Sequence, residues 1–275
     1  MEYSPKKMQE LLDKNEFSFK KKFGQNFIID ENIINNIITK ADIDKNTLVI
    51  EIGPGAGSLT SKLALKAKNV LCYEIDTKLE GILKENLKEY NNIDIIYDDF
   101  LNADVNNDLK KYNYDKLYVV ANLPYYITTP IIIKIIEKKI NVDKIVVMVQ
   151  KEVGDRFKAK PGSKDYSSLS IFLNYYFDIK KVIDVSRNVF LPKPNVDSIV
   201  VEFIKKEQKL ELKNEDIFFK LIRDSFKQKR KTIKNNLKDY DLEKIELILK
   251  KYNMDLSVRA EAISIEIFVE LANIL

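Results

Sequence analysis

Between Thr47 and about Lys206, short apolar runs rich in β-branched residues alternate with amphipathic stretches. Runs of this kind are typical of strands, and the stretches between them have the periodicity of helices. The strand candidates are Thr47–Ile52, Asn69–Ile75, Ile93–Tyr97, Lys116–Ala121 and Asp143–Val149, and the helix candidates are Ser58–Lys66, Thr77–Tyr90 and Thr129–Lys138. Strands that are apolar on both faces and alternate with helices predict an α/β fold, with a parallel sheet covered on both sides.

Two later runs, Ile179–Val185 and Ser198–Ile204, have no long helix between them. We therefore expect them to form an antiparallel hairpin at one edge of the sheet, because antiparallel strands need no helical crossover. A mostly parallel, seven-stranded sheet that ends in this way resembles the Rossmann-like fold of class I S-adenosylmethionine-dependent methyltransferases.

Past Lys206 the strand pattern stops, and apolar residues recur three and four positions apart, as in amphipathic helices. This pattern covers Asp216–Phe226, Leu242–Tyr252 and Ile263–Leu275. We predict a boundary near Lys206, with one domain at residues 1–206 and an all-helical one at 207–275. About 70 residues are few for a self-sufficient core, so we expect the second domain to pack on the first.

The chain contains no histidine, which removes Ser/His and Cys/His triads and His-ligated zinc from the possible chemistries. Its single cysteine, Cys72, excludes an intramolecular disulfide and lies in an apolar run, so we interpret it as a core residue. No apolar run approaches the roughly 18 residues of a membrane span, and the N-terminus lacks the apolar core of a signal peptide. A cytoplasmic protein is the expectation.

A glycine-rich loop, Glu51-Ile52-Gly53-Pro54-Gly55-Ala56-Gly57, follows the first strong strand and leads into a helix. Closely spaced glycines let a ligand approach the backbone where a side chain would collide. The spacing differs from the phosphate-binding G-x-G-x-x-G, and Glu51 would repel a pyrophosphate yet suit a cation. S-adenosylmethionine fits this loop, since it carries a sulfonium and an ammonium and no phosphate.

Acidic residues stand at the ends of three successive strand candidates: Glu51, Glu74 and Asp99. A carboxylate at the position of Glu74 can hold two ribose hydroxyls, and Asp99 can accept from an adenine amino group. Each acid alone is typical of a helix cap or a turn. Three together favour a ligand crevice at the carboxyl edge of the sheet.

Asn122-Leu123-Pro124-Tyr125 follows the fourth strand candidate. This motif predicts a site that binds the exocyclic amine of an adenine for methylation. The lone pair of this amine is delocalised into the purine, so the nitrogen is a poor nucleophile. The Asn122 amide oxygen and a backbone carbonyl fixed by Pro124 can accept both amino hydrogens and direct the lone pair outward. Tyr125 then offers a ring for the extruded base. An ordinary Asn/Pro turn is the alternative.

A basic stretch between Arg223 and Lys238 contains seven cations and one acid, Asp224. Such a local excess suits a polyanion, although many lysine-rich helices are merely solvated faces.

Taken in order, these motifs resemble the rRNA adenine N6-methyltransferases, and most closely the small-subunit rRNA adenine dimethyltransferases. The likeness runs from about Lys20 to the C-terminus. Beyond the glycine loop and Asn122–Tyr125, it rests on Lys22–Phe27, Gln150–Val153, Lys160–Ser163, Phe190–Ser198, Phe226–Thr232 and Arg259–Glu261.

The resemblance implies roles for individual residues. Those expected at the cofactor are Gln25, Asn26, Phe27, Glu51, Gly53, Gly55, Gly57, Glu74, Ile75, Asp99, Phe100 and Asn122. Those expected at the target base are Asn122, Leu123 and Tyr125, with Phe190 covering its other face. The expected RNA-binding residues are Lys227, Lys229, Arg230, Lys231 and Lys234, with Lys20, Lys21 and Lys22 in an N-terminal arm. Lys193 stands where the family commonly has a further proline.

The resemblance implies an enzyme that dimethylates N6 of two adjacent adenines in a small-subunit rRNA hairpin during ribosome assembly. Residues 1–206 would be the methyltransferase domain and residues 207–275 the RNA- and ribosome-binding domain. S-adenosyl-L-methionine would be converted to S-adenosyl-L-homocysteine without a metal, and the expected partner of the monomer is rRNA in an immature subunit.

Three alternatives stay open. The first is a large-subunit rRNA adenine methyltransferase of the macrolide-resistance type, which uses a similar Asn-x-Pro-Tyr motif. The second is a non-catalytic RNA-binding assembly factor. A methyltransferase for protein glutamine amides is disfavoured by the single proline of the motif and by the basic helical domain.

Overall fold

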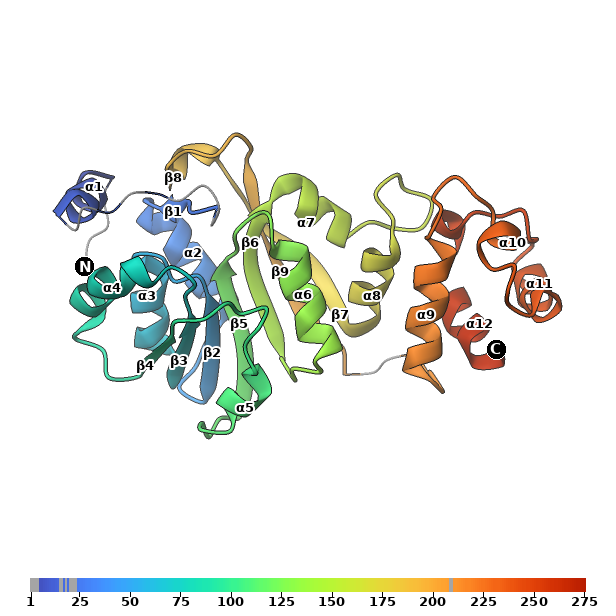
Figure 1. Ribbon diagram of the computed structural model, residues 1–275, viewed down its shortest axis with the longest axis horizontal. Coiled ribbons are helices and arrows are strands. Elements are labelled where there is room, and N and C mark those ends of the chain that lie inside the picture. Colours follow the sequence, from blue (N-terminus) through green and yellow to red (C-terminus); the bar gives the residue numbers. More distant parts are fainter. Residues whose placement is uncertain (1–4, 15–16, 18, 20–23, 208–209) are drawn as a thin grey trace. The chain divides into compact units, whose positions relative to one another are not determined.

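The computed structural model describes residues 5–14, 17, 19, 24–207 and 210–275. Its central element is a seven-stranded sheet in the order β4-β3-β2-β5-β6-β9-β7 (Figure 1). The strands are β2 (Thr47–Ile52), β3 (Asn69–Tyr73), β4 (Ile93–Ile96), β5 (Lys116–Asn122), β6 (Lys144–Gln150), β7 (Phe177–Val185) and β9 (Ser198–Lys205). The five strands from β4 to β6 pair in parallel, and β9 runs antiparallel to β6. The expected mostly parallel sheet with an antiparallel edge is confirmed.

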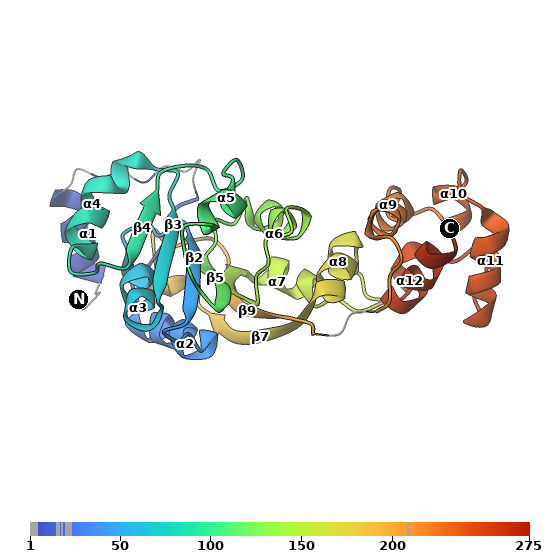
Figure 2. The ribbon, with the colours of Figure 1, turned by 90° about the horizontal axis from the view of Figure 1, so that it is seen from below.

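Helices connect the parallel strands and cover the sheet, as the alternating pattern predicts. Figure 2 shows α2 and α3 on one face and α5 and α6 on the other. The helices of this part are α2 (Glu31–Ala41), α3 (Ser58–Lys66), α4 (Glu80–Leu87), α5 (Val105–Leu109), α6 (Thr128–Glu137) and α7 (Lys151–Phe157). Asp30 caps α2 by accepting a 2.8 Å hydrogen bond from the Asn32 amide. Cys72 lies fully buried in the core beneath α3, as expected.

Two short strands lie outside the main sheet and were not predicted from the sequence. β1 (Phe27–Ile28) pairs antiparallel with β8 (Phe190–Leu191), so that Ile28 stands opposite Phe190. The N-terminal helix α1 (Pro5–Lys14) buries Leu12 in a cluster with Phe27 and with apolar residues of α4. Segments far apart in the sequence are thereby gathered beside the carboxyl ends of the strands.

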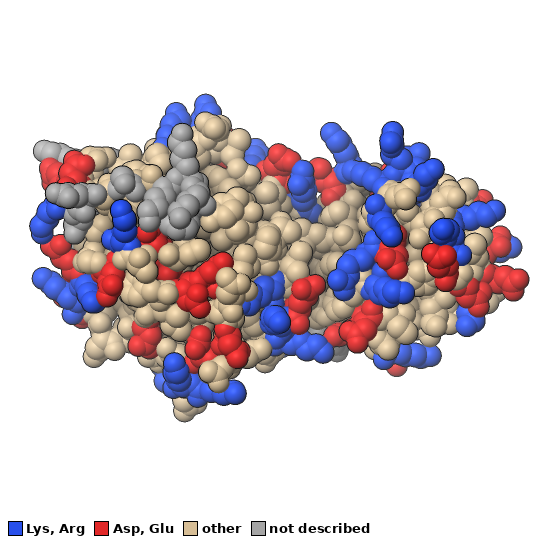
Figure 3. Space-filling view, viewed as in Figure 1, with Lys and Arg blue, Asp and Glu red and all other residues tan. Residues whose placement is uncertain are grey.

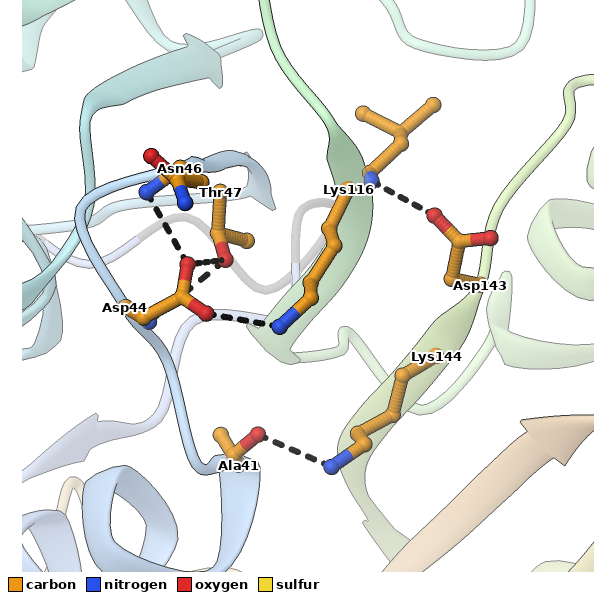
Figure 4. Close-up of polar contacts among 8 residues, drawn as sticks. Ala41, Asp44, Asn46, Thr47, Lys116, Asp143 and Lys144 are labelled. Carbon is orange, nitrogen blue, oxygen red and sulfur yellow. Dashed lines mark hydrogen bonds and ion pairs between the residues drawn. The ribbon is translucent and has the colours of Figure 1, made fainter.

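Polar contacts tie the amino ends of the strands to the loops that precede them (Figure 4). The Lys116 ammonium lies 2.6 Å from the Asp44 carboxylate, which also accepts from the Thr47 hydroxyl at 2.8 Å. Asp143 accepts from the Leu117 amide, and Lys144 donates to the Ala41 carbonyl. These contacts join the amino ends of β2, β5 and β6 to the loops before them and to the end of α2, which indicates a structural role for this edge of the sheet.

The described residues divide into two compact units. One contains those before Asp155 together with Lys180–Ile204, and the other contains Asp155–Ile179 and those after Ile204. The helices of the second unit are α8 (Ser168–Tyr176), α9 (Glu215–Ser225), α10 (Ile233–Asn236), α11 (Leu242–Lys251) and α12 (Ile265–Ile274). The helical character expected past Lys206 is present. The helix α8, which precedes that boundary, groups with these helices.

Packing explains why α8 belongs with the later helices. Ile171 and Tyr175 of α8 lie in one buried cluster with Phe218 of α9 and Phe268 of α12. The Tyr166 hydroxyl also donates to the Ile263 carbonyl at 3.1 Å. Across the part of the chain that the structure describes, the helices are all too short or too polar to cross a membrane.

Candidate active site

A pocket lies at the carboxyl ends of β2, β3 and β5, where the glycine loop, the second acidic strand end and Asn122 meet. The segment that leads into β1 closes one side. The lining residues are Gly24, Gln25, Asn26, Phe27, Ile28, Glu51, Gly53, Pro54, Gly55, Ala56, Ser58, Leu59, Glu74, Ile75, Leu79, Asn122, Leu123, Pro124 and Tyr125. The structure therefore brings together most of the residues expected at the cofactor and three of the four expected at the base.

The glycine loop follows β2 in a conformation that other residues rarely adopt. Gly53, Gly55 and Gly57 have φ values of 72°, 58° and 84°. A Cβ atom on Gly55 would lie 2.9 Å from the Phe27 ring, so a side chain there would displace the wall of the pocket. The loop thus exposes backbone to the pocket and turns the chain into α3, whose N-cap is Gly57.

Two buried carboxyl groups face this loop. Glu51 is 1% exposed, and its burial raises its pKa to about 8. Glu74 is 4% exposed, and burial raises its pKa to about 7, although its oxygens accept from the amides of Asp76 and Gly55. The charge of Glu74 also raises the pKa of Glu51. Paired buried acids favour a ligand that brings positive charge or hydroxyl donors.

A hydrogen bond links the side wall of the pocket to the same acidic edge. The Gln25 amide donates to Asp76 at 2.9 Å, and Asp76 is itself buried. Next along the chain, the Asn26 side chain donates to the Gly24 carbonyl at 3.0 Å. The segment Gly24–Asn26 is therefore held across the pocket by its own side chains.

Asn122 is the last residue of β5, and its amide is oriented by a distant segment. The Asn122 Nδ2 atom donates to the Asn26 carbonyl at 2.8 Å. Among the described residues, the amide oxygen accepts no hydrogen bond, so it is the end presented to an incoming donor. The neighbouring Leu123 amide donates to Met148 O in β6 at 3.1 Å, which anchors the motif to the sheet.

Pro124 and Tyr125 form a turn in which the Pro124 carbonyl and the Tyr125 hydroxyl each make hydrogen bonds. The Pro124 carbonyl accepts from the Ile127 amide and from the Thr128 hydroxyl, both at 3.2 Å. This acceptor is therefore engaged within the turn. The Tyr125 hydroxyl lies 2.7 Å from the hydroxyl of Ser198, the fully buried first residue of β9. A half-buried aromatic ring is thus fixed at its far end. The role of Ser198 was not foreseen, because a contact across 73 residues leaves no local signal.

Four expected site residues do not line the pocket. Gly57 lies at the helix start, and Asp99 uses its carboxylate to accept from the Leu101 amide at 2.9 Å. Phe100 is buried edge-to-face against Tyr73, with 5.3 Å between ring centroids. Phe190 is 2% exposed and packs in the core beside Ile28. In this structure its ring does not cover the pocket, and its expected contact with a base stays a prediction.

Lys134 supports the turn after β4, a role that was not predicted from the sequence. It is 9% exposed in the apolar helix α6 and donates to the carbonyls of Phe100 and Ala103. Burial lowers its pKa, and its ammonium lies 5.0 Å from the centroid of the Phe100 ring. The one signal was a lysine inside the otherwise apolar run Ile131–Ile136.

The expected RNA-binding cations are all exposed; four lie between α9 and α10, and Lys234 lies within α10. Figure 3 shows Lys and Arg side chains gathered on this helical unit. Among the described residues these five cations, Lys227, Lys229, Arg230, Lys231 and Lys234, form no ion pair, and Lys229 donates to the Lys164 carbonyl at 3.0 Å. Lys20, Lys21 and Lys22 lie outside the described residues.

A family model described as ribosomal RNA adenine dimethylase matches residues 16–275. The ribosomal RNA small subunit methyltransferase A of a Staphylococcus aureus strain is 48% identical over 98% of this chain and 93% of that protein. Its namesake from Macrococcus caseolyticus is 46% identical over 99% of this chain and 97% of the relative.

Solved structures agree in fold. A dimethyladenosine transferase from Plasmodium falciparum superposes with a TM-score of 0.75 at 29% identity, covering 89% of this chain and 95% of that one. The 23S rRNA methyltransferase ErmE has a TM-score of 0.70 at 26% identity, covering 90% and 98% of the two chains.

Proposed function

Because this chain belongs to the ribosomal RNA adenine dimethylase family, we propose that it dimethylates N6 of two adjacent adenines in small-subunit rRNA, using S-adenosylmethionine. The family match covers nearly the whole chain, and the small-subunit relatives are 46–48% identical over almost their full length. The observation that carries the proposal is the position of Asn122. Its amide oxygen is presented to the same pocket as the glycine loop and the buried acids.

The pocket fits S-adenosylmethionine by the chemistry of its lining. This cofactor supplies a methyl group on a positively charged sulfur. The bare backbone at Gly53 and Gly55 accommodates its close approach, and Glu51 and Glu74 offset its positive charge. Glu74 at the end of β3 would accept from the ribose hydroxyls. The expected contact of Asp99 with the adenine amino group stays a prediction, because Asp99 does not line the pocket and accepts from the Leu101 amide.

At the other end of the pocket, backbone and side-chain acceptors prepare the amine of the target base. The Asn122 amide oxygen and the Leu123 carbonyl each accept one N6 hydrogen, which favours a pyramidal nitrogen with its lone pair toward the methyl donor. We assign the second acceptor to the Leu123 carbonyl because the Pro124 carbonyl already accepts two hydrogen bonds within the turn. Tyr125 stacks on the extruded base, and Ser198 fixes the ring.

Positioning and exclusion of water supply most of the acceleration in this scheme. The methylated nitrogen carries a positive charge and is acidic enough for water to remove its proton. A histidine base is therefore unnecessary, which agrees with its absence from the chain. The exposed cations of the helical unit contact phosphates of the rRNA and set its orientation.

Methylation of large-subunit rRNA is the second candidate. The observation that favours it is the shared fold with ErmE. The identity of 26% to that protein is well below the 46–48% to the small-subunit relatives. A non-catalytic assembly factor would not need the intact acceptor pair at Asn122 and Leu123.

The deciding experiment supplies the purified protein and radiolabelled S-adenosylmethionine with unmodified small or large ribosomal subunits in separate reactions. We expect label in the small subunit, recovered as dimethyladenosine after digestion of the rRNA. The Asn122→Ala protein serves as the catalytic control. Label recovered from the large subunit alone would replace this proposal with the second candidate.

A further inference from the structure

Tyr126, the residue after the target-base motif, is 53% exposed, whereas Tyr125 is half-buried and hydrogen-bonded. It lies in the turn closed by the hydrogen bond from Ile127 to Pro124. Exposure of one aromatic side chain is ordinary, so the contacts of the Tyr126 ring are what indicate its role.

The Tyr126 ring rests against Gly24, at the start of the segment that crosses the pocket. A Cβ atom built on Gly24 would lie 3.1 and 3.2 Å from two ring carbons, and Gly24 has a φ of 57°. The ring therefore packs on a backbone that has no side chain, in a conformation that favours glycine. Both the aromatic ring and the bare backbone are needed for this contact.

Hydrogen bonds connect this contact with the reacting centre. The Gly24 carbonyl accepts from the Asn26 side chain, and the Asn26 carbonyl accepts from the Asn122 amide. The outer end of this short chain is the Tyr126 ring, and its inner end is the residue that holds the target amine. Gln25 adds a bond to the acidic edge through Asp76.

The charged groups that act on the Tyr126 phenol are acidic. Partial burial raises the pKa of Tyr126, and the carboxylates of Asp99 and Glu74 raise it further. Both acids stand on the cofactor side, at the ends of β4 and β3. An RNA backbone would be repelled from those two acids, so the negative charge near Tyr126 disfavours a phosphate contact.

We propose that Tyr126 is a positioning residue that holds the Gly24–Asn26 segment closed over the bound cofactor and slows its release. The identity of the cofactor rests on the proposed function. The closed segment also keeps the Asn26 carbonyl in place for Asn122, so the same contact couples cofactor retention to the orientation of the amide. Loss of one aromatic contact predicts about tenfold faster cofactor dissociation.

The test measures the dissociation rate of S-adenosylhomocysteine from the full-length protein by stopped-flow displacement. Tyr126→Ala is expected to release the nucleoside about tenfold faster, with an unchanged melting temperature, whereas Tyr126→Phe keeps the ring and the wild-type rate. Gly24→Ala should also accelerate release, since its Cβ meets the ring. In the double variant the two effects should be less than additive, because each breaks the same contact.

Wild-type dissociation in Tyr126→Ala would overturn this role. If the unchanged rate comes with a raised KM for the rRNA, the ring is an RNA contact instead. Failure of the proposed function gives a different pattern. In that case wild-type protein leaves small subunits unlabelled, while the dissociation rates still differ between Tyr126→Ala and Tyr126→Phe.

Discussion

The side-chain amide of Asn122 donates a 2.8 Å hydrogen bond to the backbone carbonyl of Asn26, a residue 96 positions earlier in the chain. This bond fixes which end of the amide faces the pocket. The nitrogen is engaged, so the oxygen is presented to a hydrogen-bond donor. The target-base motif is therefore oriented by the segment that closes the cofactor pocket.

Replacing Asn122 by Ala should lower the methylation rate at saturating substrates by about 100-fold or more, because one acceptor for the target amine is lost. The affinity for rRNA should stay within about twofold, since the RNA does not rely on that oxygen for most of its binding, whereas loss of the bond to Asn26 can weaken cofactor binding. Single-turnover kinetics and equilibrium binding measure the two effects separately. Near-normal turnover in this variant would disprove the assigned role.

Breaking the bond between Tyr125 and Ser198 should loosen the stacking ring without removing it. Ser198→Ala is expected to reduce turnover about fivefold, which corresponds to the net value of one hydrogen bond. Tyr125→Phe removes the other hydroxyl and serves as the matched variant. The double variant should be no slower than either single one, because one bond is lost in all three. Fully additive losses would show that the two hydroxyls act separately.

Cofactor binding should release protons between about pH 7 and 8. Burial raises the pKa of Glu74 to about 7 and of Glu51 to about 8, so both carboxyls are partly protonated there in the free protein. A cationic ligand favours the charged form and lowers both pKa values. Calorimetry in buffers of different ionisation enthalpy counts the protons, and affinity should rise with pH across this range. Glu51→Gln should release fewer protons, and an unchanged count would contradict the assignment.

The raised pKa values of Glu51 and Glu74 also determine how the folding stability of the ligand-free protein changes with pH. The folded-state pKa values exceed the ordinary glutamate value of 4.5, so the protonated groups favour folding below that pH. This contribution is lost as pH rises toward 7 and 8. Glu51→Gln should therefore flatten the fall in melting temperature over that interval, as measured by thermal unfolding at a series of pH values.

Removing cations from the helical unit should weaken rRNA binding in a salt-dependent manner. Each lost phosphate contact reduces the slope of log affinity against log salt by about 0.7–0.9. Arg230→Gln combined with Lys231→Gln is expected to reduce it by about 1.4–1.8. The matched control is Lys244→Gln with Lys250→Gln, since these lysines pair with Asp241 and Glu246 of their own helix. An equal loss in both double variants would mean that the contacts are not local to the basic stretch.

The sheet and the acidic pocket could be predicted because their signals are local. Apolar runs such as Thr47–Ile52 are buried along their whole length, and Glu51 and Glu74 follow from their positions at strand ends. The glycine loop was likewise recognisable, since closely spaced glycines are rare in this chain, which has seven in all.

What the sequence did not reveal depends on tertiary contacts. The burial of Phe190 depends on pairing between two strands of two residues each, which is too short to leave a periodic pattern. The bond from Ser198 to Tyr125 and the bonds from Lys134 to the turn after β4 join residues more than 30 positions apart. The grouping of α8 with the helical unit is decided by packing of Ile171 and Tyr175, whose apolar character alone fits either unit.

The central claim is tested most directly by mass spectrometry of small-subunit rRNA from cells that lack this protein. The account predicts that N6,N6-dimethyladenosine disappears from two adjacent positions, returns with the wild-type gene and does not return with the Asn122→Ala gene. Undiminished dimethyladenosine in the small-subunit rRNA of the deleted cells would contradict it.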